Sequence, residues 1–199
     1  MSIAREFILL THDLEPTDSV DLDDLPGAGR ADLIARTVTA ALLLSHAVRT
    51  DVRVHICVAG AYTITFDGSS IRHLHPDERS TAALVGKALR AHTDVIGAQP
   101  TPVSPGLSIR RAGLQEVLSA LPPTASPLRL SPEGTPLASR PVPEHPVCVL
   151  SDHRSFTDAE LAVLGAQTTP ISVGPRVLHG ADAVTVVHNY LDTAGFSEY

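Results

Sequence analysis

Polar and glycine residues follow three apolar runs of this sequence, at points where connecting loops could bind a ligand. Leu130 precedes residues 131–134, Leu150 precedes Ser151-Asp152-His153, and Val173 precedes Gly174-Pro175. If the runs are parallel strands, their carboxyl ends lie at one edge of a sheet, where α/β proteins bind ligands. Glycine lets the backbone approach a ligand closely, so exposed amides and carbonyls could hydrogen-bond an adenine edge. Taken alone, Gly174-Pro175 predicts only a turn.

Strand-like and helix-like patterns alternate along the chain and would hold these loops. We expect strands at 6–10, 51–59, 106–110, 128–130, 147–150 and 170–173, and helices at 31–46, from about 76, at 112–121, 157–167 and 181–192. Segments 62–66 and 70–74 flank Asp67-Gly68, a pair typical of a hairpin turn. Residues 131–146 are rich in proline and predict a loop. The alternation predicts an α/β fold with a mainly parallel sheet flanked by helices.

Composition narrows the class of protein. A chain of 199 residues with 43% hydrophobic residues suits one domain with a real core. Residues 1–10 do not resemble a signal peptide, and no stretch approaches the roughly 20 apolar residues of a membrane span, so we expect a soluble, cytoplasmic protein. The formal net charge of −7 argues against non-specific coating of nucleic acid. Lys87 is the only lysine; the many arginines reflect a GC-rich genome or a use in binding RNA.

Two residue types that often carry chemistry are predicted to be structural in this chain. Cys57 and Cys148 each lie inside an apolar run, which favours inert core thiols. The pair His73 and His75 lacks companion ligands at a convincing spacing. We therefore predict neither cysteine chemistry nor a metal site.

Residues 171–192 resemble the C-terminal donor-binding segment of SPOUT methyltransferases, in which the chain threads through a loop to make a trefoil knot. Other blocks look like those of the archaeal tRNA (pseudouridine-54 N1)-methyltransferases, which act on the T-loop of tRNA. These blocks are residues 23–30, 44–46, 51–55, 76–79, 104–106 and 151–153. The similarity runs in order over essentially the whole chain. It implies a single SPOUT domain over residues 1–199, with a donor-binding knot at approximately 128–195, and a homodimer.

The resemblance also implies a site for the methyl donor, S-adenosylmethionine. Its residues would be Leu130, Ser151, Val173, Gly174, Pro175, Arg176, Val177, Leu178 and Ala183. Related members often have glycine at the position of Ser151, and some have cysteine at that of Ala183. Backbone contacts would survive both changes, whereas a role that needs a thiol at 183 would not.

Methylation of pseudouridine requires that the N1 proton be removed and that N1 be aligned with the donor's methyl group. Positioning can contribute roughly 7–11 kcal/mol to such reactions. Asp152, at a strand end beside the expected donor loop, is the candidate to orient or deprotonate N1. The alternative is that Asp152 caps a turn, which is the common use of aspartate in loops.

Contacts to RNA are best assigned to arginines, although the sequence does not show that they cluster. The candidates are Arg30, Arg36, Arg53, Arg79, Arg110 and Arg111. The Gly-Ala-Gly sequence at 27–29 lacks the third glycine of a dinucleotide fingerprint. We interpret it as a turn that delivers Arg30 toward the substrate at the start of a helix.

Two other functions remain open from the sequence. The same fold could methylate a pseudouridine of ribosomal RNA. Alternatively, the chain could be a non-catalytic RNA-binding relative, which the residues at 151 and 183 slightly favour. Binding of S-adenosylmethionine would distinguish an enzyme from the non-catalytic relative.

Overall fold

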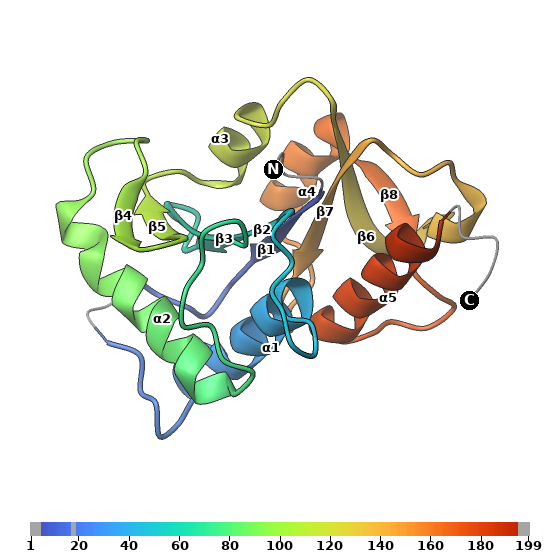
Figure 1. Ribbon diagram of the computed structural model, residues 1–199. Coiled ribbons are helices and arrows are strands. Elements are labelled where there is room, and N and C mark those ends of the chain that lie inside the picture. Colours follow the sequence, from blue (N-terminus) through green and yellow to red (C-terminus); the bar gives the residue numbers. More distant parts are fainter. Residues whose placement is uncertain (1–4, 17–18, 195–199) are drawn as a thin grey trace.

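In the computed structural model, which describes residues 5–16 and 19–194, eight strands form one sheet in the order β4-β5-β3-β2-β1-β7-β6-β8 (Figure 1). The strands are β1 (Arg5–Leu10), β2 (Val52–Val58), β3 (Tyr62–Asp67), β4 (Thr101–Ser104), β5 (Leu107–Arg110), β6 (Ala125–Pro136), β7 (His145–Ser151) and β8 (Thr169–Ser172). The pairings among β2, β1, β7, β6 and β8 are parallel, and those of β2–β3, β3–β5 and β5–β4 are antiparallel. The mainly parallel α/β sheet expected from the sequence is confirmed. Residues 1–4, which belong to the segment considered above for a signal peptide, lie outside the described residues.

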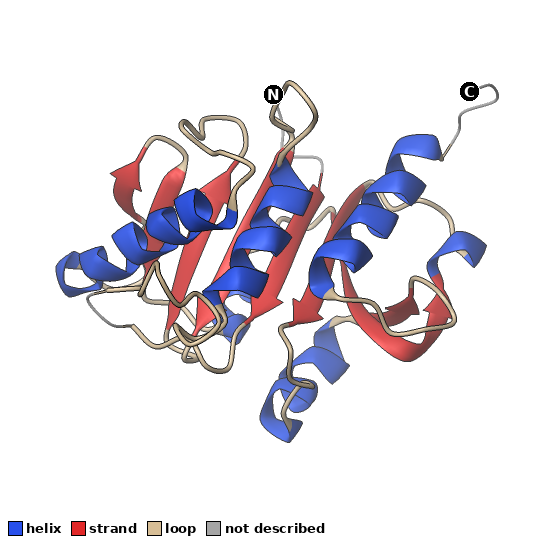
Figure 2. Ribbon diagram, turned by 90° about the horizontal axis from the view of Figure 1, so that it is seen from below, coloured by secondary structure: helices blue, strands red, loops and turns tan. Residues whose placement is uncertain are grey.

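Helices cover both faces of the sheet. On one face α2 (Glu78–Arg90), α1 (Ala31–Leu42) and α5 (Gly180–Thr193) lie side by side, as Figure 2 shows. On the other face α3 (Leu114–Ser119) contacts α4 (Asp158–Gln167). Two short 3₁₀ helices, η1 (Ala91–Asp94) and η2 (Leu137–Ser139), complete the elements described. No helix within the described ranges is long and apolar enough to cross a membrane.

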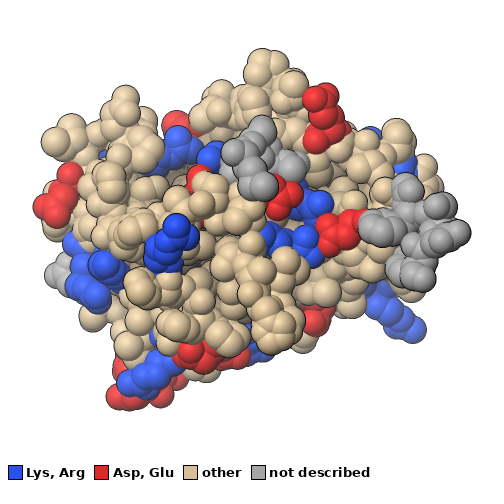
Figure 3. Space-filling model, in the orientation of Figure 1, with Lys and Arg blue, Asp and Glu red and all other residues tan. Residues whose placement is uncertain are grey.

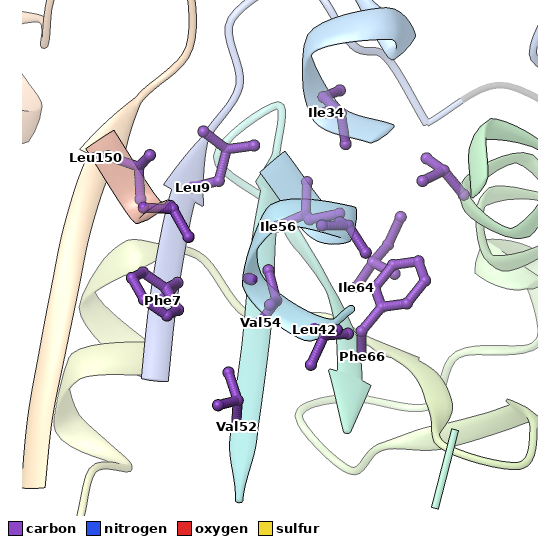
Figure 4. Packing of buried hydrophobic residues seen from close by; sticks show 14 of the residues in the cluster. Phe7, Leu9, Ile34, Leu42, Val52, Val54, Ile56, Ile64, Phe66 and Leu150 are labelled. Atoms are coloured by element: carbon purple, nitrogen blue, oxygen red, sulfur yellow. The ribbon is translucent and has the colours of Figure 1, made fainter. Parts of the chain in front are cut away.

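The central strands are buried because helices cover them on both sides. In β1, Phe7 and Leu9 belong to the core under α1 and α5, whereas Ile8 and Leu10 belong to the core with α3 and α4. Parallel strands covered in this way read as continuous apolar runs. Figure 4 shows the larger core, in which side chains of β1, β2, β3 and β7 pack beneath α1.

The antiparallel half of the sheet is apolar on one face only. Ile64, Phe66 and Ile109 are fully buried in the core on the α1 and α2 side. Their neighbours in sequence, such as Thr65 and Ser108, point to the opposite face, since side chains alternate along a strand. That opposite face is therefore polar, and it forms the floor of a second cavity described below.

The hairpin predicted at Asp67-Gly68 is wrong. Asp67 ends β3, its carboxylate accepts hydrogen bonds from Ser69 and Arg53, and residues 70–74 form no strand. The neighbours of β3 are β2 and β5, and the turn from β2 to β3 uses Ala59 and Gly60, both with positive φ. Such φ values match the twist of hairpin strands. Asp67 and Gly68 form a local turn. The Asp67 side chain holds this turn by accepting hydrogen bonds from Ser69, and β3 ends there.

Two other boundaries differ from the sequence prediction. The helix expected over 31–46 ends at Leu42, because Leu43 is extended and pairs with Val48. The segment 131–146, expected to be a loop, begins as strand, since β6 continues to Pro136. It does so because Thr135 and Pro136 pair again with β8 after an interruption at 131–134. The edge strand β8 thus contacts β6 at two separate places.

Candidate active site

A cavity of about 680 Å³ lies at the carboxyl ends of β1, β6, β7 and β8. Its walls include the N-terminal turns of α1 and α5, together with the loop 152–156 before α4. Its volume is within the range of about 300–1,000 Å³ typical of small-molecule sites. Parallel strands deliver their following loops to one edge, so this is where an open α/β sheet is expected to bind a ligand.

The structure brings the residues predicted to hold the donor into this one cavity, with a single exception. Pro175 does not line it. The residues that do are Leu130, Ser151, Val173, Gly174, Arg176, Val177, Leu178 and Ala183. The Ser151 hydroxyl donates a hydrogen bond to the Arg154 carbonyl at 2.5 Å, which directs it into its own loop. Ala183 is 5% exposed and packs at the start of α5.

Asp152 lies in the cavity wall, but its carboxylate is already engaged. The side chain is 1% exposed. Oδ2 accepts the backbone N–H of His12 at 2.8 Å, and Oδ1 accepts His12 Nδ1–H at 2.7 Å and the Arg154 N–H at 2.9 Å. The second imidazole nitrogen of His12 lies 3.2 Å from a Glu160 oxygen. Asp152 therefore joins the end of β7 to the segment that follows β1.

The imidazole of His12 is held between two carboxylates. Burial opposes protonation of this ring, but hydrogen bonds to Asp152 and Glu160 outweigh it, so the pKa of His12 is raised above its usual value. Protonation of the ring therefore strengthens the contact between the ends of β1 and β7. His153, which lines the cavity, lies 3.0 Å from Asp13 and 3.6 Å from Asp152. The sequence prediction missed this second set of polar residues at the end of β1.

The two cysteines are inert, as predicted. Both are buried, and burial raises the pKa of the Cys57 thiol and that of the Cys148 thiol to about 12. A thiol that stays protonated is neither a nucleophile nor a metal ligand. Among the described residues, no three His, Cys, Asp or Glu side chains gather in a way that could hold a metal ion.

The six candidate arginines do not form one basic surface. Arg30 and Arg36 line the cavity, whereas Arg53 and Arg110 line a second cavity of about 460 Å³ over the polar face of β2, β3 and β5. The other two lie apart: Arg79 pairs with Asp23, and the Arg111 guanidinium stacks over the Tyr62 ring. Basic and acidic residues are also interspersed on the face seen in Figure 3.

The turn predicted before Arg30 is present. Gly29 and Arg30 both have positive φ, and Arg30 is the N-cap of α1. A Cβ at Gly29 would lie 2.7 Å from the Asp13 carbonyl oxygen, so only glycine fits there. The Arg30 guanidinium is fixed by Asp32, whose two oxygens it contacts at 3.0 Å. The turn brings Arg30 to the cavity beside the Asp152 loop.

A family model described as putative SAM-dependent RNA methyltransferase matches residues 4–196. The chain belongs to this family. The prediction of an RNA methyltransferase that uses S-adenosylmethionine is thereby confirmed.

Relatives and a solved structure agree with this assignment. A tRNA (pseudouridine(54)-N(1))-methyltransferase of Haloarcula marismortui is 46% identical over 197 residues, covering 98% of this chain and 100% of that protein. One from Methanopyrus kandleri is 38% identical over 201 residues, covering 98% and 96%. The crystal structure of Archaeoglobus fulgidus Nep1 bound to S-adenosylhomocysteine superposes with a TM-score of 0.66 at 15% identity, covering 95% and 97%. That similarity establishes a shared fold.

Proposed function

We propose that the protein transfers the methyl group of S-adenosylmethionine to N1 of pseudouridine 54 in tRNA, and that it does so in the cytoplasm. The observation that carries this proposal is the 46% identity to a tRNA methyltransferase over 98% of this chain. A ligand-sized cavity at the strand ends supports it. The donor supplies an electrophilic methyl group on its sulfonium. The task of the protein is to hold the donor and to present N1 in line with that methyl group.

The donor would lie against the backbone of β6, β8 and the segment 173–178. The wall at Gly174 is open, because a Cβ added there would meet no protein atom within 4 Å. Backbone groups in this segment can hydrogen-bond a planar base whatever the side chains at 151 and 183 are. The residues Ser151 and Ala183 are therefore compatible with donor binding, which favours an enzyme over a non-catalytic relative.

Asp152 would act on the substrate by orienting its surroundings. Its two oxygens accept three hydrogen bonds within the protein and the side chain is 1% exposed, so the carboxylate is fixed in the protein's own network, which supports an orienting role. Those contacts hold the loop that carries His153 and Arg154 at the rim of the cavity. The target base, which is partly stacked in the T-loop, would have to turn out of the RNA to reach this rim.

A trefoil knot would explain the path of the chain between β6 and α5. Ile171 of β8 pairs with Leu130 and again with Thr135, so residues 131–134 arch across β8. Beyond β8 the chain passes to α5, which packs against α1, and the Tyr190 hydroxyl donates a hydrogen bond to the Arg140 carbonyl at 2.6 Å. A crystal structure in which the segment after β8 does not pass through a loop formed by an earlier part of the chain would contradict the knot.

A second copy of the chain would cover apolar side chains beside the cavity. Val177 is 80% exposed, Leu178 is 38% exposed, and Val186 of α5 is 37% exposed. Burying such side chains on association is favourable at about 25 cal/mol per Å² of apolar surface. We expect a homodimer by sedimentation velocity, and Val177→Asp should shift it toward monomer.

The RNA contacts are proposed at all six arginines, with Arg110 the most informative. Arg110 lines the second cavity, and its side chain makes no ion pair or hydrogen bond within the described residues, whereas Arg53, which lines the same cavity, pairs with Asp67. A free guanidinium is available to an RNA phosphate. Arg110→Gln should therefore reduce the slope of log K for tRNA against log salt by about 1. Arg79→Gln, which removes a cation already paired with Asp23, should change that slope less. Equal slopes for wild type and Arg110→Gln would contradict this contact.

The experiment that tests the function uses the protein, labelled S-adenosylmethionine and unmethylated tRNA with pseudouridine at position 54. We expect one methyl group per tRNA, located on that base by mass spectrometry. The matched control is the same tRNA with uridine at 54, which has no free N1 and should stay unlabelled. Label in a ribosomal RNA fragment containing pseudouridine but not in tRNA would overturn the proposal in favour of ribosomal RNA. Binding of tRNA without any transfer would favour the non-catalytic relative.

A further inference from the structure

Arg129 is an unpaired cation in the wall of the donor cavity. It lies in β6 next to Leu130 and lines the cavity. Its Nε is fully buried and has no hydrogen-bond partner, and it is the only side-chain nitrogen or oxygen in the described part of the chain with that property. No carboxylate of the described residues lies within ion-pair distance of its guanidinium.

Three of the four other arginines that line the cavity are paired. Arg30 contacts Asp32 at 3.0 Å, Arg36 contacts Asp32 at 2.9 Å, and Arg154 pairs with Asp13. The fourth, Arg176, makes no ion pair or side-chain hydrogen bond within the described residues, but it is exposed, so water can solvate its guanidinium. A buried nitrogen without a partner is therefore particular to Arg129 among these five arginines.

A guanidinium whose Nε is buried without a hydrogen-bond acceptor is unfavourable. Burial penalises a charge unless a counter-charge and hydrogen bonds compensate for the lost water. Arginine does not escape this penalty by losing its proton, because its pKa is too high in proteins. An anion that comes with the ligand would supply the acceptor that the protein does not.

We propose that Arg129 binds the carboxylate of the methionine portion of S-adenosylmethionine. This inference rests on the proposed function and adds an anchor for the one anionic group of the donor. The planar guanidinium can donate two parallel hydrogen bonds to a carboxylate. A phosphate of the RNA is the less favoured anion, because Arg129 adjoins Leu130, a residue predicted to hold the donor, in the wall of the same cavity.

Calorimetry with two ligands tests the assignment. S-adenosylhomocysteine carries the carboxylate, whereas 5′-methylthioadenosine has the same adenosine and sulfur without it. Arg129→Met should weaken binding of S-adenosylhomocysteine by about 10- to 100-fold, the usual cost of losing a hydrogen bond to a charged group. Binding of 5′-methylthioadenosine should change by less than about 2-fold. Arg129→Lys, which keeps the charge but not the planar fork, should fall between Arg129→Met and wild type.

Two controls separate recognition from structure. Arg154→Met removes a cation from the same cavity that is already paired with Asp13, so it should affect S-adenosylhomocysteine much less than Arg129→Met does. The melting temperature of ligand-free Arg129→Met should be equal to or above that of wild type, because the substitution removes a buried donor without a partner.

Each other result overturns the inference in a distinguishable way. Equal losses for the two ligands would mean that Arg129 packs the cavity. An unchanged affinity for S-adenosylhomocysteine with weaker tRNA binding would assign Arg129 to a phosphate. If wild-type protein bound neither adenosine ligand, the proposed function itself would fail.

Discussion

Replacing Asp152 with Asn will lower the turnover of tRNA methylation by about 100-fold, within the range for a group that acts directly on a proton transfer or orients its site. Asn has one acceptor oxygen, whereas Asp152 uses two. In the variant an amide N–H₂ must face either the backbone N–H of His12 or the N–H groups of His12 Nδ1 and Arg154. The loop 152–154 therefore shifts at the rim of the cavity. Turnover at saturating donor and tRNA measures the loss, and calorimetry with S-adenosylhomocysteine measures whether the donor site survives.

The pH dependence of this variant separates the two possible roles of Asp152. If Asp152 orients the loop, raising the pH does not restore turnover. If it accepts the N1 proton, turnover recovers as the pH rises and N1 ionises without help. Glu160→Gln is the matched control. Glu160 is the other carboxylate that contacts His12, and it does not line the cavity. Its turnover should fall much less. Unchanged turnover in Asp152→Asn with intact donor binding would exclude both roles.

The parallel half of the fold could be predicted from the sequence because its signal is local. Strands β1 and β7 contain the apolar runs 7–10 and 147–150, and the helix expected over 157–167 is α4, with Thr157 as its N-cap. The antiparallel half could not be predicted, because pairing of β3 with β5 depends on segments far apart in the chain. Asp67-Gly68 has the composition of a hairpin turn, but whether the chain reverses there depends on which strand pairs with β3, and the contact of Asp67 with Arg53 of β2 appears only in the folded chain.

Segments at the carboxyl ends of parallel pairings form the site, but the sequence prediction considered only three of them. These are the segment after Leu130 within β6 and the loops after β7 and β8, and they do meet in one cavity. The end of β1 is of the same kind, since Leu10 is followed by Thr11-His12-Asp13. These residues hold Asp152 and His153. His12 was missed because a histidine after an apolar run has no distinctive spacing; only the position of β1 beside β7 makes it part of the site.

The arginines show where sequence reasoning ends. Nothing in the sequence distinguishes Arg36, which is paired twice, from Arg129, which is unpaired. Whether an arginine is available to a ligand depends on which carboxylates the fold places nearby. The family resemblance predicts the donor-binding residues, and the structure adds the ion pairs that decide which of the arginines around them lack a partner.

Replacing Gly134 with Ala will disrupt the junction beside the donor cavity at which β6 meets β8 for the second time. A Cβ at this position would lie 2.4 Å from the carbonyl carbon of Ile171 and 2.5 Å from its Cα and N. These are backbone atoms of β8, so no side-chain rotation relieves the contact and β6 must move away from β8. Overpacking of this kind costs roughly 3 kcal/mol, which corresponds to a fall of about 6–12 °C in melting temperature for a chain of this size.

The matched control has the opposite sign. Gly165 lies inside α4, and a Cβ there meets nothing within 4 Å, so Gly165→Ala should stabilise the protein by about 0.5–1 kcal/mol. Thermal unfolding of both variants measures these changes. At a temperature where circular dichroism shows Gly134→Ala still folded, its affinity for S-adenosylhomocysteine should also fall, because Leu130 and Ile171 on either side of the junction line the cavity. If Gly134→Ala had the melting temperature of wild type, residues 131–134 would be able to shift without loss of stability. The second pairing of β6 with β8 would then not hold the donor site in place.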